Sequence, residues 1–168
     1  LSSNLLSNEN VIIGNTVLYG ATKGKLFVAG IAGDRFCVRN SGAEAVVEGC
    51  GDNGCEYMTG GNVVILGEVG NNFGAGMTGG MAFVYDKEGT LPLRINLDDV
   101  FYQQQMNPYW EDFLLEKIRG HVLETNSKYA ENILKNWENQ KYLFWQVVPK
   151  EMVEKFKQPV LFKKEKRA

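Results

Sequence analysis

The feature that most restricts the fold of this 168-residue chain is a short repeat in its first half. Four similar stretches begin at Gly14, Ala32, Gly51 and Gly70, so their starts are 18, 19 and 19 residues apart. Between them lie apolar runs rich in valine: Leu26–Ala29, Ala45–Val47, Val63–Leu66 and Ala82–Tyr85. A fixed period of this length predicts a solenoid, in which each repeat is one coil and neighbouring coils bury each other's apolar faces.

The composition of the repeat predicts that the coils are made of β-strands joined at glycine corners. Valine, isoleucine and aromatic residues favour strands, and glycine adopts the positive φ of a tight corner without steric cost. All four stretches end on a glycine, and we expect these to occupy equivalent corners: Gly24, Gly42, Gly61 and Gly80. We also expect a ladder of stacked side chains in the column before them: Thr22, Asn40, Thr59 and Thr78.

A second interpretation of the glycines is a nucleotide site, because residues 74–79 have the pattern G-x-G-x-x-G. That fingerprint requires a helix after the glycines, and an acidic residue about 20 positions further on contacts the ribose. Asp98 and Asp99 are near the required distance. The glycines are followed, however, by the apolar run Met81–Tyr85 and a turn, which predicts a strand. The repeat therefore accounts for the glycines better than a cofactor site does.

Charge and hydropathy indicate no nucleic-acid or membrane partner. The net charge is −2, and no apolar run approaches the roughly 20 residues of a membrane span. The chain begins at Leu1 rather than methionine, so we expect it to be part of a longer protein.

The three cysteines, Cys37, Cys50 and Cys55, are expected to be unliganded thiols. An odd number argues against a disulfide framework and favours a reducing compartment, so we expect the chain to be cytoplasmic. Cys50 and Cys55 have the spacing that opens some iron–sulfur sites, but the companion C-x-x-C is missing.

The composition changes near residue 90, and we divide the chain into a β-helix domain (1–105) and a helical cap or docking tail (106–168). Residues 93–97 are interpreted as one more edge strand. Asn107 and residues 126–127 are expected to start two helices, residues 144–148 to be extended, and Pro149 to open a last short helix through Phe156. The helices are expected to cover the open end of the solenoid, whose unpaired edge would otherwise aggregate.

No residue is predicted to be catalytic, to bind a cofactor or to ligate a metal. His121 is the only histidine and has no ligand-spaced partner, although Glu124 lies one turn further on. The acidic residues of the coils are expected to lie on solvated faces: Glu44, Glu48, Glu56 and Glu68.

Two long phrases resemble a known family. "VRNSGAEAVVEG" (38–49) and "NFGAGMTGG" (72–80), with the sequence around them, closely resemble the C-terminal G-x-G-x-G domain of the large chain of glutamate synthase. The resemblance is dense over residues 9–89 and looser through "ETNSKYAENILKNW" and "FWQVVPKEMVEKF". The same domain type occurs in one component of formylmethanofuran dehydrogenase, but the helical tail favours glutamate synthase.

The resemblance implies a right-handed, single-stranded β-helix within an enzyme of glutamate biosynthesis and nitrogen assimilation. That oxidoreductase moves the amide nitrogen of glutamine onto 2-oxoglutarate, using FMN and an iron–sulfur cluster held in other domains. This chain would then be a non-catalytic structural domain, packing against the glutaminase and synthase domains. Its tail aromatics, Trp110, Trp137 and Trp145, are candidates for that interface. The alternative left open is a stand-alone ligand-binding β-helix.

Overall fold

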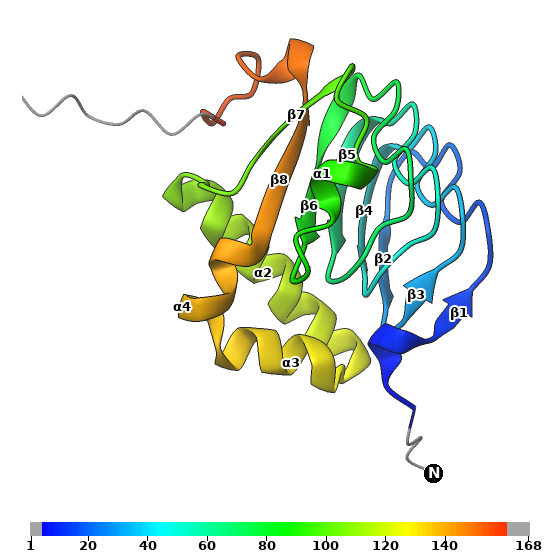
Figure 1. The fold of residues 1–168 in the computed structure, drawn as a ribbon, viewed down its shortest axis with the longest axis vertical. Coiled ribbons are helices and arrows are strands. Elements are labelled where there is room, and N and C mark those ends of the chain that lie inside the picture. The colour runs from blue at the N-terminus through cyan, green and yellow to red at the C-terminus, as the bar shows by residue number, and fades with distance from the viewer. Residues whose placement is uncertain (1–4, 161–168) are drawn as a thin grey trace, which may run out of the picture.

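The computed structural model describes residues 5–160 and shows a β-solenoid of about four turns with helices on one side (Figure 1). The β-solenoid predicted from the repeat is therefore confirmed. The strands are β1 (Val11–Ile13), β2 (Lys25–Val28), β3 (Ile31–Ala32), β4 (Ser41–Val47), β5 (Thr59–Ile65), β6 (Gly79–Tyr85), β7 (Val100–Gln103) and β8 (Phe144–Pro149). The α-helices are α1 (Leu91–Arg94), α2 (Pro108–Thr125), α3 (Lys128–Lys135) and α4 (Trp137–Gln140).

The main sheet has six strands in the order β2-β4-β5-β6-β8-β7. Its first four strands are parallel, as expected for successive coils, whereas β8 pairs antiparallel with both β6 and β7. The register joins Val28 to Val47, Val47 to Ile65 and Ile65 to Val84, so the coils advance by 19, 18 and 19 residues.

This register corrects the predicted alignment by one residue in the second coil. Gly33, not Ala32, lies beside Gly14, since a Cβ added to Gly33 would be 2.9 Å from the Gly14 carbonyl carbon. In the same way Ala43, not Gly42, is the neighbour of Gly61, where an added Cβ would lie 2.2 Å from the Ala43 carbonyl oxygen. The prediction of four equivalent glycine corners is therefore wrong for Gly42.

Each coil contains a turn in which every second residue has positive φ. The four sets are Thr16, Leu18 and Gly20; Arg35, Cys37 and Arg39; Asn53, Cys55 and Tyr57; and Asn72, Gly74 and Gly76. Only three of these twelve residues are glycine, although a left-handed conformation is unfavourable for other residues. The turns thus follow the coil period in backbone conformation, and mostly without glycine.

Hydrogen bonds between coils stabilise these unfavourable turns. Arg35 and Arg39 donate their backbone N–H groups to carbonyls of the next coil, on Asp52 and Glu56. Cys37, between them, donates in the opposite direction to the Val17 carbonyl of the preceding coil. Alternating backbone conformation therefore lets each turn bond to both neighbours, so buried polar groups of the turn are paired.

Side-chain ladders are present, but not in the predicted column. Asn40 is buried and bonds within its own coil, accepting from the Ala43 N–H at 2.9 Å. The ladders run along two other columns that join side chains to the next coil. In one, Asn15, Asp34 and Asp52 each accept from the backbone N–H of Asp34, Asp52 and Asn71, respectively. In the other, amides bond to amides through Asn53, Asn72 and Asn96.

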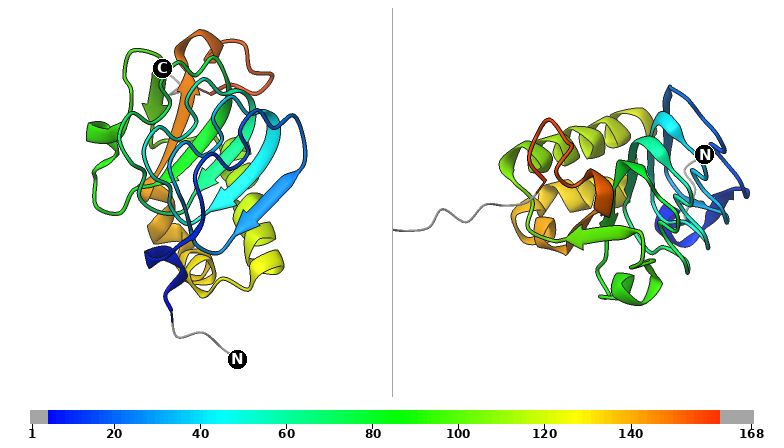
Figure 2. Two further views of the ribbon diagram at one scale, coloured as in Figure 1. Left: turned by 90° about the vertical axis from the view of Figure 1, so that its right-hand side faces the viewer. Right: turned by 90° about the horizontal axis from the view of Figure 1, so that it is seen from above.

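The sheet is buried on both faces, which explains why its strands are continuous apolar runs rather than alternating ones. Val63 and Ile65 point into the solenoid, where they meet turn residues such as Phe73. Val64 lies on the other face, in a second core that α2 and α3 complete. Figure 2 shows these helices along one side of the sheet and the turns of the coils on the other.

The helices cover the outer face of the sheet, not the open end of the solenoid as expected. Trp110 and Trp137 belong to the second core and are only 7% and 8% exposed. They are therefore core residues, and the prediction that they form an interface is wrong. The edge of β6 is instead covered by β8, which the sequence correctly indicated as extended.

Two helix starts are confirmed and two other local predictions are wrong. The Asn107 and Ser127 side chains accept from the N–H groups of Trp110 and Ala130, capping α2 and α3. Residues 93–97 are not a strand, because Pro92 and the Asp86 carboxylate, which accepts from the N–H groups at the start of the turn, favour α1. After Pro149 there is only a 3₁₀ turn over Lys150–Met152. The domain division at residue 105 stays a prediction.

Candidate functional site

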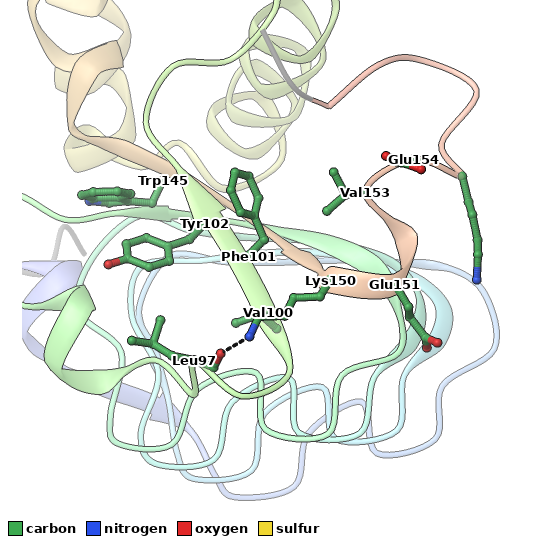
Figure 3. A pocket seen from close by; sticks show the side chains of 10 residues that line it. Leu97, Val100, Phe101, Tyr102, Trp145, Lys150, Glu151, Val153 and Glu154 are labelled. Atoms are coloured by element: carbon green, nitrogen blue, oxygen red, sulfur yellow. Dashed lines mark hydrogen bonds between the residues drawn. The ribbon is translucent and has the colours of Figure 1, made fainter.

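A groove runs along β7, the outermost strand of the sheet (Figure 3). Its volume is about 1020 Å³. Its apolar lining comes from the start of β7, from β8 and from the turn after β8: Leu97, Val100, Phe101, Tyr102, Trp145 and Val153. Charged side chains, among them Glu151 and Glu154, lie toward one end. No motif predicted this groove, because it is formed by segments about 45 residues apart in the sequence.

The groove walls are held in place by contacts that leave its centre apolar. The rings of Tyr102 and Trp145 contact each other with centroids 4.8 Å apart. The Lys150 ammonium donates to the carbonyl of Leu97 at 2.6 Å, a contact drawn in Figure 3, and to that of Asp98 at 3.1 Å. The lysine is therefore occupied in joining the β8 end to the segment before β7.

A buried polar cluster joins α2 to the coils. Glu48, 1% exposed, lies 3.2 Å from His121 through Oε1 and Nε2, and His121 is fully buried. Ser127 donates its hydroxyl to the same Glu48 oxygen and accepts from the Ala130 N–H. Burial raises the pKa of Glu48, but hydrogen bonds from His121, Ser127 and Ser7 outweigh it, so the pKa lies below its ordinary value.

This cluster corrects two predictions. The sequence predicts Glu48 on a solvated face, and helical spacing indicates Glu124 as the contact of His121. The carboxylate that reaches His121 is Glu48 on the coil, 73 residues away in the sequence, so spacing along the helix could not reveal it. Glu44 is half-buried and pairs with Lys117 at 3.1 Å, whereas Glu68 is exposed. A structural role for His121 fits its position between helix and coil.

The cysteines lie inside the solenoid, and their thiols are shielded from water. Cys37 and Cys55 are fully buried and Cys50 is 5% exposed. Burial raises the pKa of Cys50 to about 12, and it raises the pKa values of Cys37 and Cys55 well above their ordinary range. Among residues 5–160, no three or more His, Cys, Asp or Glu side chains form a group able to hold a metal.

These thiols should be unreactive in the folded protein, because the thiolate is the reacting form and its formation is suppressed by burial. We expect iodoacetamide to modify none of the three in native protein at neutral pH, and all three after unfolding in guanidinium. Mass spectrometry of the intact chain gives the count. Modification of a cysteine without loss of the native circular dichroism spectrum would contradict the buried placement.

The whole-chain comparison agrees with the architecture described above. The family model described as the GXGXG motif matches residues 2–150. The chain belongs to this family. In the large chain of glutamate synthase [NADPH] from Azospirillum brasilense, 159 residues are 60% identical, covering 95% of this chain and 10% of that protein. Ferredoxin-dependent glutamate synthases from Cyanidium caldarium and spinach chloroplasts are 52% and 53% identical over 85% and 84% of this chain, and 9% of their own length. The chain thus spans about a tenth of these relatives.

As a member of the GXGXG family, the chain uses its glycines for the solenoid and not for a nucleotide turn. Gly74 and Gly76 have φ values of 75° and 64° and continue the column of left-handed residues. A Cβ added to Gly79 would lie 2.1 Å from the Thr59 carbonyl oxygen of the preceding coil. Gly79 begins β6, so a strand stands where the dinucleotide fingerprint needs a helix. Among residues 5–160 of this family member, no helix is long and apolar enough to cross a bilayer.

Proposed function

We propose that this GXGXG chain is a non-catalytic structural domain of a glutamate synthase, the enzyme that makes glutamate from glutamine and 2-oxoglutarate. It would pack against the glutaminase and FMN-binding synthase domains, which would hold the FMN and the iron–sulfur cluster. The relatives that share 52–60% identity with it are glutamate synthases about ten times its length. Glutamate biosynthesis in the cytoplasm is the setting that this proposal implies.

The observation that carries the proposal is the unclosed end of the solenoid. Within the described residues, β2 pairs only with β4 and β1 only with β3, so the first coil has an outer edge without a strand partner. Val11 and Ile12 on this coil are 66% and 55% exposed. An open, apolar strand edge associates readily with another chain, and proteins usually cover it. A domain that is enclosed within a larger enzyme would have this edge covered by the rest of that enzyme.

A chimera tests the proposal. This chain would replace the matching segment of the Azospirillum brasilense large chain, and glutamate formation from glutamine and 2-oxoglutarate would be measured with the cognate reductant. We expect the chimera to be active, and we expect the double substitution Val11→Lys and Ile12→Asp to reduce activity and soluble assembly at least tenfold. Those charges would be buried without partners at the domain contact.

Leu123→Lys is the matched control, because Leu123 is 78% exposed on α2, away from the first coil. It should leave the chimera unchanged, and both variants should leave the circular dichroism of the isolated chain unchanged. If the first-coil variant is as active as the control, that edge is not a docking surface. Glutaminase or glutamate synthase activity of the isolated chain would contradict a non-catalytic role.

A further inference from the structure

The groove along β7 lies at the opposite end of the sheet from the open first coil. The strand order places β2 at one end and β7 at the other, and β7 pairs with β8 alone among the described strands. An edge strand presents a row of backbone N–H and C=O groups that point away from the sheet. The groove therefore borders groups that can form a further β-ladder.

The side chains of the groove come from both faces of the sheet, so it wraps around the strand edge. Tyr102 and Trp145 contact the core inside the solenoid. Phe101, the neighbour of Tyr102, points to the other face because successive side chains of a strand alternate. Figure 3 shows Phe101 on the side of Val153, with Tyr102 and Trp145 on the other side of β7. An added strand would thus find apolar contacts on both of its own faces.

The chemistry of the groove fits a polypeptide better than a small polar ligand. Small-molecule sites bring a few polar groups together inside an apolar pocket. Here the centre is apolar, the Lys150 ammonium is bonded to two carbonyls, and the carboxylates of Glu151 and Glu154 lie at one end. An apolar centre with a charged rim is the usual composition of a protein interface.

We propose that this groove binds an extended, apolar segment from the rest of the glutamate synthase polypeptide, which adds to β7 as a further strand. This inference rests on the proposed function, because the relatives have about nine tenths of their length outside the matched segment. Leu97 lines the groove and is 49% exposed, and Leu93, four residues before it, is 84% exposed. Apolar exposure therefore gathers at this sheet edge as it does at the first coil, as expected if the parent enzyme covers both.

Amide hydrogen exchange tests the proposal directly. Exchange of a peptide spanning residues 98–106 would be compared between the isolated chain and the chimera described above. The amides of β7 that bond to β8 are protected in both proteins. We expect those that point away from β8 to exchange at least 100-fold more slowly in the chimera, because they enter a new ladder.

Two substitutions of Phe101 provide a matched pair. Phe101→Asp places a carboxylate in the apolar groove and should return the outer β7 amides to the exchange rates of the isolated chain. Phe101→Leu keeps the groove apolar and should retain the protection within about threefold. Unchanged exchange of β7 between isolated chain and active chimera would overturn the inference.

The design separates failure of this inference from failure of the proposed function. If the chimera is active and its first coil is protected while β7 is not, only the groove inference fails. If the chimera is inactive and neither edge is protected, the proposed function fails. If β7 of the isolated chain becomes protected with rising concentration, and light scattering shows a doubled mass, the occupant is a second copy of this chain and the inference is overturned.

Discussion

Replacing Gly61 by alanine is expected to lower the free energy of unfolding by about 3–5 kcal/mol, enough to unfold a large fraction of a marginally stable domain. Gly61 has φ 82°, a conformation that is strained for alanine. The added Cβ would also lie 2.2 Å from the Ala43 carbonyl oxygen of the preceding coil. That oxygen belongs to the backbone, so relief requires the coils to separate. Urea unfolding followed by circular dichroism measures the change.

Two other glycines separate the causes of this effect. Gly24 has φ 105° but no atom within 4 Å of an added Cβ, and Gly14 has neither positive φ nor a neighbour. Gly24→Ala should therefore cost about 1–2 kcal/mol from backbone strain alone, and Gly14→Ala should be nearly neutral. Equal losses for Gly61→Ala and Gly24→Ala would show that crowding between coils contributes nothing.

Replacing Glu48 by alanine is the second large effect, with an expected loss of about 2–4 kcal/mol in the free energy of unfolding. The substitution leaves the Ser127 hydroxyl and a fully buried His121 without their carboxylate. Glu44→Ala is the control on the same strand, since Glu44 pairs with Lys117 at the half-exposed surface and such pairs contribute about 0–1 kcal/mol. If both variants unfold at the same urea concentration, the buried cluster does not stabilise the fold.

The Glu48 cluster also predicts a pH dependence of stability. Folding lowers the pKa of this carboxyl from its ordinary value of 4.5, so its contribution is fully present above pH 4.5 and is lost as pH falls through the lower folded value. Glu48→Gln removes the titrating group while keeping the side-chain shape. The stability difference between wild type and Glu48→Gln should thus shrink as pH falls below 4.5. A difference that stays constant over that range would contradict the lowered pKa.

The sequence was sufficient for the repeat but not for its register. Apolar runs such as Val63–Leu66 and the recurring glycines are local signals, and the coils they predict are present. The error at Gly42 arose because coil length varies between 18 and 19 residues, and a glycine one position away could be aligned instead of Ala43. The left-handed residues Leu18 and Cys37 carry no sequence signal, because their conformation is imposed by hydrogen bonds between coils.

The polar cluster and the groove could not be predicted because both depend on tertiary contacts. Glu48 and His121 are 73 residues apart, and their contact exists only because α2 crosses the outer face of the sheet. Trp137 resembles surplus aromatic surface in the sequence, because nothing local shows that the sheet is buried on both faces. Helix caps such as Asn107 were predictable because a cap is a contact within four residues.

The alternating turns have a consequence for how this fold tolerates insertions and deletions. A residue added between Arg35 and Arg39 would exchange left- and right-handed positions for the remainder of the turn, breaking bonds to both neighbouring coils. The pairing between β4 and β5 is irregular between Ser41 and Glu44, and that between β5 and β6 is irregular between Thr59 and Asn62. Coil length therefore varies where the turn enters the strand. Homologous coils that differ in length should differ at that corner, and a loop grafted there should be accepted where the same loop in the turn would not be.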